Sequence, residues 1–229
     1  MKRIGILGGL SAESTALFYN TLTRLYIEQH GDTGYPEIVI FSVRFLDFLN
    51  MLKQGNWEEC ASYLASGINA LEKAGADFAV ISANTPHIVF NKIEEKVSLP
   101  LIHIADAVAE VAKSKGYKKV ALLGTKATMN ADFYPVCLSR HNIECYNPSD
   151  EQKEMVNQIL ESELYKGIIN EESRTFYLNL IDEMKEIEAD AVILGCTEIP
   201  MLINSENSPL PILDSAVILA QASLDKAFR

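Results

Sequence analysis

Short apolar runs alternate with longer amphipathic stretches along the whole chain. Most of the runs are continuous, which is typical of strands buried on both faces of a parallel sheet. They predict strands at 3–7, 38–43, 78–82, 101–104, 120–123, 143–146, 191–194 and 212–213. Helical spacing between them predicts helices at 12–30, 57–74, 85–96, 106–115, 131–141, 151–165, 171–187 and 215–228. The alternation indicates a doubly wound α/β fold with parallel sheets.

The chain also repeats itself over a long interval. Residues 76–85 return as 189–198, which is 113 positions later, and residues 2–9 return as 118–125. Solenoid repeats have much shorter periods, typically about 20 to 50 residues. The repeat therefore predicts two similar domains, each built around its own sheet.

The expected domain boundaries fall at two proline-containing segments. We expect the first domain to hold residues 1–97 and 209–229, and the second to hold residues 98–208. Pro100 and Pro209 favour extended connections of the kind that link domains. We expect the ligand site in the cleft between the two domains, at the carboxyl ends of their strands.

The composition is that of a globular protein with no polyanionic partner. Of the 229 residues, 48% are apolar and 22% are charged. A net charge of −11 argues against nucleic acid binding, which needs clustered cations. No stretch approaches the roughly 20 apolar residues of a membrane span, and the apolar run at the amino end is too short for a signal peptide. The four cysteines lack paired spacing, so we expect reduced thiols and a cytoplasmic protein.

Cys196 is the principal candidate for chemistry. It follows Gly195 at a predicted strand end, and the repeat places Ala83 at the same position of the first half. A buried cysteine at a strand end is often only a small core residue. However, N–H groups of the following turn would lower the thiol pKa, and Glu198 would accept or relay its proton. Both interpretations stay open at this point.

Two glycine loops offer hydroxyls at strand-to-helix turns. Ser11 lies in the first loop, which begins at Gly8, and Thr125 and Thr128 lie in its mate in the second half. Such hydroxyls and backbone N–H groups either cap a helix or bind an anion such as a carboxylate. The glycine spacing is not that of a dinucleotide-binding fingerprint, and Arg44 alone suggests NADP, which makes this cofactor the weaker alternative.

Further polar residues follow the two repeated strands. Asn84 and Thr85 precede Pro86 as a helix cap would, and they also suit carboxylate binding, as Thr197 does in the second half. His87 is either a packed residue or an acid–base group.

Other chemically capable side chains carry weaker signals. Cys137, His141 and Cys145 are spaced four apart but lack a fourth ligand, so we expect no metal site. Lys166 and Arg44 are cations that would pair with a substrate carboxylate, although most such residues are simply solvated.

Taken together, the segments 5–15, 83–87, 123–129 and 195–198 resemble the aspartate/glutamate racemase superfamily over essentially the whole chain. The resemblance implies two pseudo-symmetric α/β domains, a homodimer, and racemisation of an acidic amino acid without pyridoxal phosphate, metal or other cofactor. In that family, a cysteine from each domain flanks the substrate Cα. One removes the α-proton and the other returns a proton to the opposite face. The matching positions imply substrate binding by Leu10, Ser11, Asn84, Thr85, Thr125, Thr128, Lys166 and Thr197.

The chain departs from this pattern at one position. The second family cysteine is Cys196, but Ala83 stands where the first belongs, and a methyl group cannot transfer a proton. One hypothesis is a slowed racemase in which water, Thr85 or His87 serves the opposite face. A second is a stereospecific one-thiol decarboxylase or isomerase of a dicarboxylate. A third is a catalytically silent protein that binds acidic amino acids.

Overall fold

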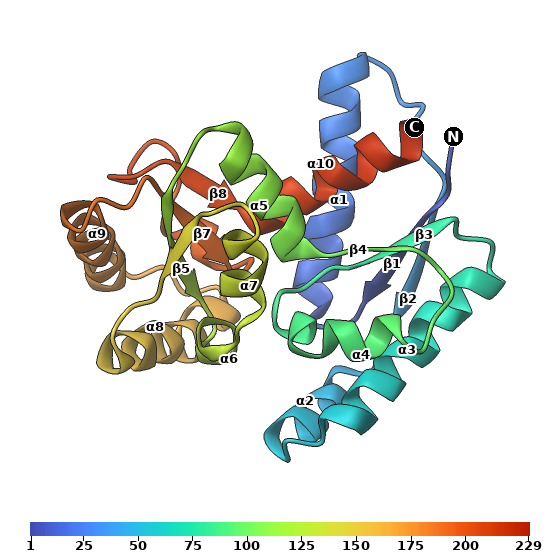
Figure 1. The fold of residues 1–229 in the computed structure, drawn as a ribbon, viewed down its shortest axis with the longest axis horizontal. Helices are drawn as coiled ribbons and strands as arrows, with labels where there is room; N and C mark the ends of the chain where they lie inside the picture. The colour runs from blue at the N-terminus through green and yellow to red at the C-terminus, as the bar shows by residue number, and fades with distance from the viewer. The chain divides into compact units, whose positions relative to one another are not determined.

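The structure is a computed structural model that describes residues 1–229. The chain divides into two units, each a parallel four-stranded sheet flanked by helices (Figure 1). The first unit comprises Met1–Ile104 and Ala216–Arg229, and the second comprises Ala105–Ser215. The α/β fold class predicted from the sequence is confirmed.

The sheet of the first unit has the strand order β2-β1-β3-β4. Its strands are β1 (Ile4–Gly8), β2 (Ile38–Ser42), β3 (Phe78–Ile81) and β4 (Leu101–Ile102). Its helices are α1 (Ala12–His30), α2 (Phe45–Lys53), α3 (Trp57–Lys73), the 3₁₀ turn η1 (Thr85–Val89), α4 (Phe90–Glu94) and α10 (Ser215–Phe228). Helices α1 and α10 lie along one side of this sheet, and α3 and α4 along the other (Figure 1).

The second unit repeats this topology in the order β6-β5-β7-β8. Its strands are β5 (Lys119–Gly124), β6 (Glu144–Tyr146), β7 (Ala191–Gly195) and β8 (Ile212–Asp214). Its helices are α5 (Ile104–Ser114), α6 (Lys126–Asn130), α7 (Phe133–Ser139), α8 (Asp150–Ser162), η2 (Leu164–Lys166), α9 (Glu171–Glu186) and η3 (Ile199–Met201). The shared strand order agrees with the internal repeat in the sequence.

The central strands and the edge strands differ in burial. Every residue of β1, β3 and β7 is buried, as their continuous apolar runs predict. Strand β2 is different, because Ile40 and Phe41 are 43% and 39% exposed. The expectation of burial on both faces is wrong for β2, which lies at the sheet edge and pairs only with β1.

The units end later than the prolines suggested. The boundaries lie after residues 104 and 215, whereas the sequence placed them after 97 and 208. The physical reason is that the two proline-containing segments lead into β4 and β8, which are edge strands of the sheet that precedes each boundary. The Ala79 N–H donates to the Pro100 carbonyl at 2.9 Å as β4 joins β3, and β8 pairs with β7 in the same way.

Two short helices, α2 and α6, were not predicted. Helix α2 begins after Arg44, whose side chain makes no capping hydrogen bond, so the usual start signal is missing from the sequence. Helix α6 is five residues long, which is too short for helical periodicity to emerge.

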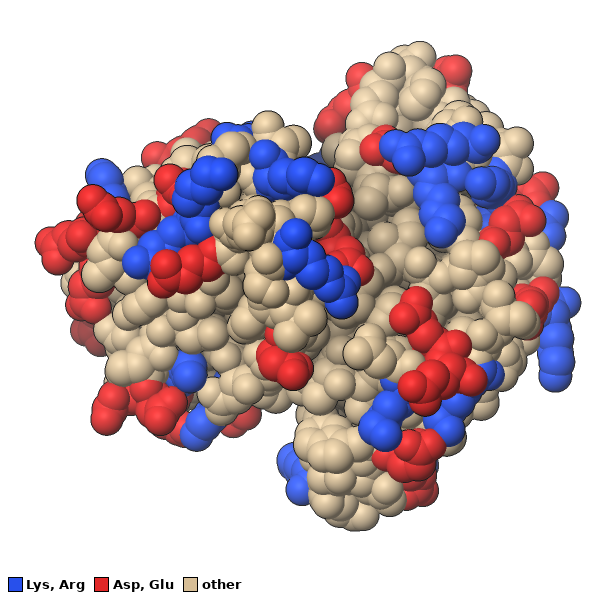
Figure 2. Space-filling view, in the orientation of Figure 1, with Lys and Arg blue, Asp and Glu red and all other residues tan.

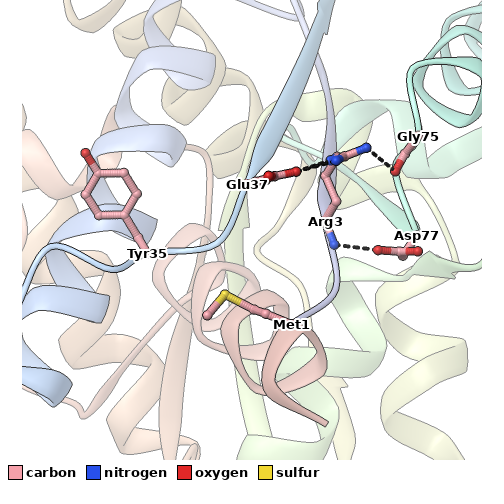
Figure 3. Close-up of a pocket in the computed structure, with 6 residues that line it drawn as sticks. All are labelled: Met1, Arg3, Tyr35, Glu37, Gly75 and Asp77. Carbon is pink, nitrogen blue, oxygen red and sulfur yellow. Dashed lines mark hydrogen bonds and ion pairs between the residues drawn. The ribbon is translucent and has the colours of Figure 1, made fainter.

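Both units are clamped at the amino ends of their strands. In the first unit, the Arg3 side chain donates hydrogen bonds to Glu37 and to the Gly75 carbonyl, and its backbone N–H donates to the Asp77 carboxylate at 2.6 Å (Figure 3). These residues line a shallow pocket together with Met1 and Tyr35. In the second unit, Asp190 accepts the N–H groups of Lys118 and Lys119 at 2.6 and 2.9 Å. The starts of β1 and β5 are thus held by an Asp carboxylate in the same way, at the opposite end of each sheet from the candidate site residues.

Charges of both signs are interspersed on the face of the molecule drawn in Figure 2. Several are paired within one unit, as Glu58 is with Lys92 at 3.1 Å and Lys96 at 2.5 Å. None of the helices combines the length and the apolar character needed to cross a bilayer.

Gly9 provides a test of the first strand-to-helix turn. Its φ is +80°, and an added Cβ would lie 2.2 Å from the Val43 carbonyl oxygen. Gly9→Ala should therefore lower the free energy of unfolding by at least about 2 kcal/mol, from backbone strain and overpacking together. Gly31→Ala is the matched control, because Gly31 also has a positive φ but has open space around it. It should cost only about 1 kcal/mol. Urea unfolding measures both, and equal losses would contradict the packing argument.

Candidate active site

Cys196 lies at the carboxyl end of the second sheet, directly after β7. Gly195 pairs with Gly124 of β5, and a Cβ on Gly124 would lie 3.0 Å from the Gly195 carbonyl oxygen. The two glycines therefore let the central strands approach closely where the chain turns. Cys196 is only 8% exposed, so its thiol is almost entirely shielded from bulk water.

Three polar groups surround the Cys196 thiol. The S–H donates to Oε2 of Glu198 at 3.0 Å, and the Thr197 hydroxyl donates to the same oxygen at 2.8 Å. The Tyr165 hydroxyl, from η2, lies 4.0 Å from the sulfur. The sequence proposed Glu198 as the proton acceptor of Cys196, and the geometry fits that role.

The surroundings of Cys196 favour the protonated thiol. Burial raises the pKa of Cys196 well above its ordinary value, and the charge and hydrogen bond of the Glu198 carboxylate raise it further. Hydrogen bonds from the Glu198 backbone and the Tyr165 hydroxyl lower the pKa, but they do not outweigh burial. The following turn thus lowers the thiol pKa as the sequence predicts, but the expectation of a lowered pKa overall is wrong, because burial and the Glu198 carboxylate raise it more. That turn, η3, is only three residues long, and its contribution is small beside desolvation.

The corresponding end of the first sheet carries no proton-transfer group at residue 83. Ala83 is half-buried and follows Ser82, whose hydroxyl donates to the Leu7 carbonyl at 3.3 Å. Asn84 is buried, and Thr85 opens η1. The Ser82 hydroxyl is thus used in a hydrogen bond to the neighbouring strand. The position equivalent to the Cys196 thiol is occupied by the methyl group of Ala83.

His87 is held as a structural residue. It is 2% exposed, and its Nδ1 lies 3.0 Å from the Ala83 carbonyl and 3.2 Å from that of Asn84. Its Nε2 accepts the Ile104 N–H at 3.2 Å, which assigns the proton to Nδ1. Burial, with the neighbouring His103, lowers the His87 pKa well below its ordinary value. Both ring nitrogens are occupied by the backbone, so the geometry does not support the acid–base role considered from the sequence.

The hydroxyls of both glycine loops cap helices. Ser11 Oγ accepts the Ser14 N–H at 3.2 Å in a reciprocal capping box at the start of α1. Thr125 Oγ1 likewise accepts the Thr128 N–H at 3.1 Å at the start of α6. Of the two interpretations left open by the sequence, capping is therefore the one made by these contacts.

Each unit nevertheless brings its candidate site residues together at the carboxyl end of its sheet. In the first unit, the ends of the paired strands β1 and β3 carry Leu10, Ser11, Ala83, Asn84 and Thr85. In the second unit, the ends of β5 and β7 carry Thr125, Thr128, Cys196, Thr197 and Glu198.

The two candidate cations have different surroundings. Arg44 is an exposed side chain whose Nη1 pairs with Asp47 at 3.2 Å. Lys166 is exposed at the end of η2, next to Tyr165.

Tyr165 is the site residue that the sequence did not reveal. It is 31 positions from Cys196, and no motif marks it. The sequence placed it at the end of a helix over 151–165, whereas α8 ends at Ser162 and Tyr165 lies in the 3₁₀ turn η2. The one signal in the sequence that points to this turn is its neighbour Lys166, a candidate binding residue.

The chain matches the family model for Asp/Glu/hydantoin racemase over residues 7–223. It is 38% identical to an aspartate racemase homologue from Pyrococcus horikoshii, with full coverage of both chains and a TM-score of 0.90. It is 27% identical to the aspartate racemase of Picrophilus torridus, covering 100% of this chain and 95% of that one, with a TM-score of 0.80. It is also 25% identical to the broad specificity amino-acid racemase RacX of Bacillus subtilis, over 96% of each chain.

The two parallel α/β units are thus the fold of solved racemase relatives. The chain belongs to the Asp/Glu/hydantoin racemase family. The resemblance inferred from the sequence motifs is confirmed, and the family supports a racemase-type isomerase activity.

Glu198→Gln tests the electrostatics of the thiol. Removing the carboxylate charge should lower the Cys196 pKa, because Glu198 is the second cause that raises it. More thiolate is then present at a given pH. Alkylation of Cys196 by iodoacetamide at pH 8, followed on its own peptide by mass spectrometry, should be roughly tenfold faster. Glu206→Gln, at an exposed carboxylate of the same unit, is the control and should leave the rate unchanged. Unchanged or slower alkylation in Glu198→Gln would contradict this account.

Proposed function

We propose that the chain is a cofactor-independent, racemase-type enzyme that acts at the α-carbon of an acidic amino acid. Cys196 is its thiol acid–base group. The observation that carries the proposal is the 3.0 Å hydrogen bond from the Cys196 S–H to the Glu198 carboxylate. This bond gives the thiol proton an acceptor at the point where a thiolate is needed.

The proposed proton transfer has two steps. Glu198 first takes the S–H proton, which leaves a thiolate on Cys196 and a neutral carboxylic acid. The thiolate then takes the substrate α-proton, so the Cα–H bond breaks, an S–H bond forms, and the electron pair spreads into the substrate's carboxylate. Burial makes the thiolate harder to form but also more basic, which suits a weakly acidic Cα–H bond.

The opposite face of the substrate is the weak point of the proposed racemase. The family pattern has a second cysteine there, and this chain has Ala83. Water or Thr85 is left to deliver the second proton, because His87 is committed to backbone hydrogen bonds. The loss of one acid–base group typically costs about 10² to 10⁴ in rate, so slow racemisation is expected.

The substrate class follows from the family and from the available donors. Aspartate and glutamate are proposed, with Lys166 and Arg44 as candidate partners of the side-chain carboxylate. Because one relative is a broad specificity racemase, neutral amino acids belong in the substrate panel as well. The homodimer and the cytoplasmic location implied by the resemblance stay predictions.

The proposal predicts thiol-dependent exchange of the substrate α-proton. L- and D-aspartate and glutamate are incubated in D₂O, and α-deuteration is followed by NMR beside chiral analysis. Cys196→Ala should lower exchange by at least about 10³-fold, whereas Cys145→Ala, at a thiol on β6, should retain it. Carbon dioxide release without exchange would indicate the decarboxylase instead. Binding with neither reaction would indicate a silent binding protein, and either result contradicts the proposal.

Ala83→Cys tests whether the other half-site is intact. A second thiol should raise racemisation by about 10²-fold in both directions, because the equilibrium constant between enantiomers is one and cannot be changed by the enzyme. Ala74→Cys adds a thiol at an exposed position of the same unit and should have no effect. Chiral chromatography measures both directions. An unchanged rate in Ala83→Cys would mean that this half of the chain no longer serves racemisation.

A further inference from the structure

We propose that Tyr165 is a positioning residue that holds and stabilises the Cys196 thiolate through a hydrogen bond from its hydroxyl. This inference rests on the proposed function for its catalytic meaning, but the contact itself can be tested without turnover. It is carried by the geometry of η2 and by the direction of the hydrogen bonds at the sulfur.

The backbone around Tyr165 is fixed by local structure. Leu164 is buried and anchors η2, and Gly167 ends the turn in the left-handed conformation with φ +71°. The N–H groups of Lys166 and Ile168 both donate to the Glu163 carbonyl, at 2.9 and 3.1 Å. The Glu163 side chain in turn accepts the Ser173 hydroxyl at 2.6 Å, which ties the turn to α9. Tyr165 thus projects from an ordered turn.

The position of Tyr165 is unusual for a surface residue. The residue is 49% exposed, yet its hydroxyl lies 4.0 Å from a sulfur that is buried. A surface tyrosine with no other role would direct its hydroxyl into water, where the hydroxyl is best solvated. Here the polar end of the side chain lies against the thiol.

The donor in this contact can be assigned. Cys196 has one S–H proton, and that proton points to Glu198 at 3.0 Å. The sulfur can therefore only accept from Tyr165, and the phenol is the donor. Burial and the nearby Cys196 and Glu198 raise the pKa of Tyr165 far above its ordinary value, so the phenol keeps its proton when the sulfur becomes a thiolate.

The two neighbours of the sulfur consequently have opposite effects. Glu198 takes the proton but its charge disfavours a thiolate, whereas the Tyr165 hydroxyl favours the thiolate. At 4.0 Å the bond is long for the neutral thiol, and a negative sulfur attracts the donor more strongly. Once the proton has moved to Glu198, Tyr165 is the donor that compensates the charge left on sulfur.

The test compares Tyr165→Phe with the intact protein. Alkylation of Cys196 by iodoacetamide is followed on its own peptide between pH 6 and pH 10, with the Cys145 peptide as internal reference. Loss of the phenol should slow Cys196 alkylation at pH 7 roughly tenfold and move its pH profile to higher pH, because less thiolate is present. Tyr35→Phe, at a half-exposed tyrosine of the first unit, is the matched control and should leave both unchanged.

A second variant separates hydrogen bonding from shielding. If the ring merely covers the thiol, Tyr165→Phe behaves like the intact protein and Tyr165→Ala alkylates faster, and this result overturns the proposal. In α-proton exchange, Tyr165→Phe should lower kcat about tenfold with little change in KM. Should the intact protein show no exchange on any substrate while Tyr165→Phe still slows alkylation, the contact with Cys196 stands and the proposed function fails.

Discussion

The proposed chemistry depends on the hydrogen bond between a buried thiol and a carboxylate two residues further along the chain. Cys196 and Glu198 lie where β7 ends, with 3.0 Å between sulfur and oxygen. In water a thiol and a carboxylate have little reason to associate. Inside the protein, burial strengthens the hydrogen bond and disfavours the thiolate, so the thiol keeps its proton at rest. In the proposed mechanism, Glu198 takes that proton when the thiolate is needed. The Cys196 thiol is therefore protonated at rest and would become a base only when its proton moves to Glu198.

The fold supplies that arrangement with few specialised residues. Paired glycines at the ends of β5 and β7 let the strands approach closely, and the chain then turns within the three residues that carry the thiol, a hydroxyl and the carboxylate. The ordered turn η2 adds a phenol from outside the repeat. In the first unit, the same topology ends in Ala83, and its neighbours Ser82 and His87 are engaged in hydrogen bonds to backbone carbonyls. The same topology thus ends in a thiol in one unit and in a methyl group in the other.

The fold was predictable from the sequence because local patterns of apolar residues determine most of its strands and helices. Continuous apolar runs located the strands, and the internal repeat predicted two sheets of the same topology. The exposure of β2 at the sheet edge and the hydrogen bond from Ala79 to the Pro100 carbonyl were not predicted, because both depend on which strands become neighbours. Ser11 and Thr125 show a different limit. A hydroxyl that caps a helix and one that binds an anion look the same until its hydrogen bonds are known.

The site was predictable where the chemistry is local in sequence. Cys196 and Glu198 are two residues apart, and their contact was expected. Tyr165 was not, because its contact with the sulfur bridges 31 positions. The direction of the Cys196 pKa shift was wrong because burial cannot be read from the motif. His87 looked suitable as an acid or base, but its ring nitrogens serve the Ala83 carbonyl and the Ile104 N–H.

If a single acid–base thiol serves one face of the substrate, as we propose, the two enantiomers should not behave alike. The most direct test is the rate of α-deuteration of each pure enantiomer in D₂O, measured before any inversion has accumulated. The account predicts that one enantiomer, whose Cα–H bond meets Cys196, exchanges with retained configuration much faster than the other. Equal exchange rates for the two enantiomers would contradict it, because they would require a second base of equal strength for the other face of the substrate.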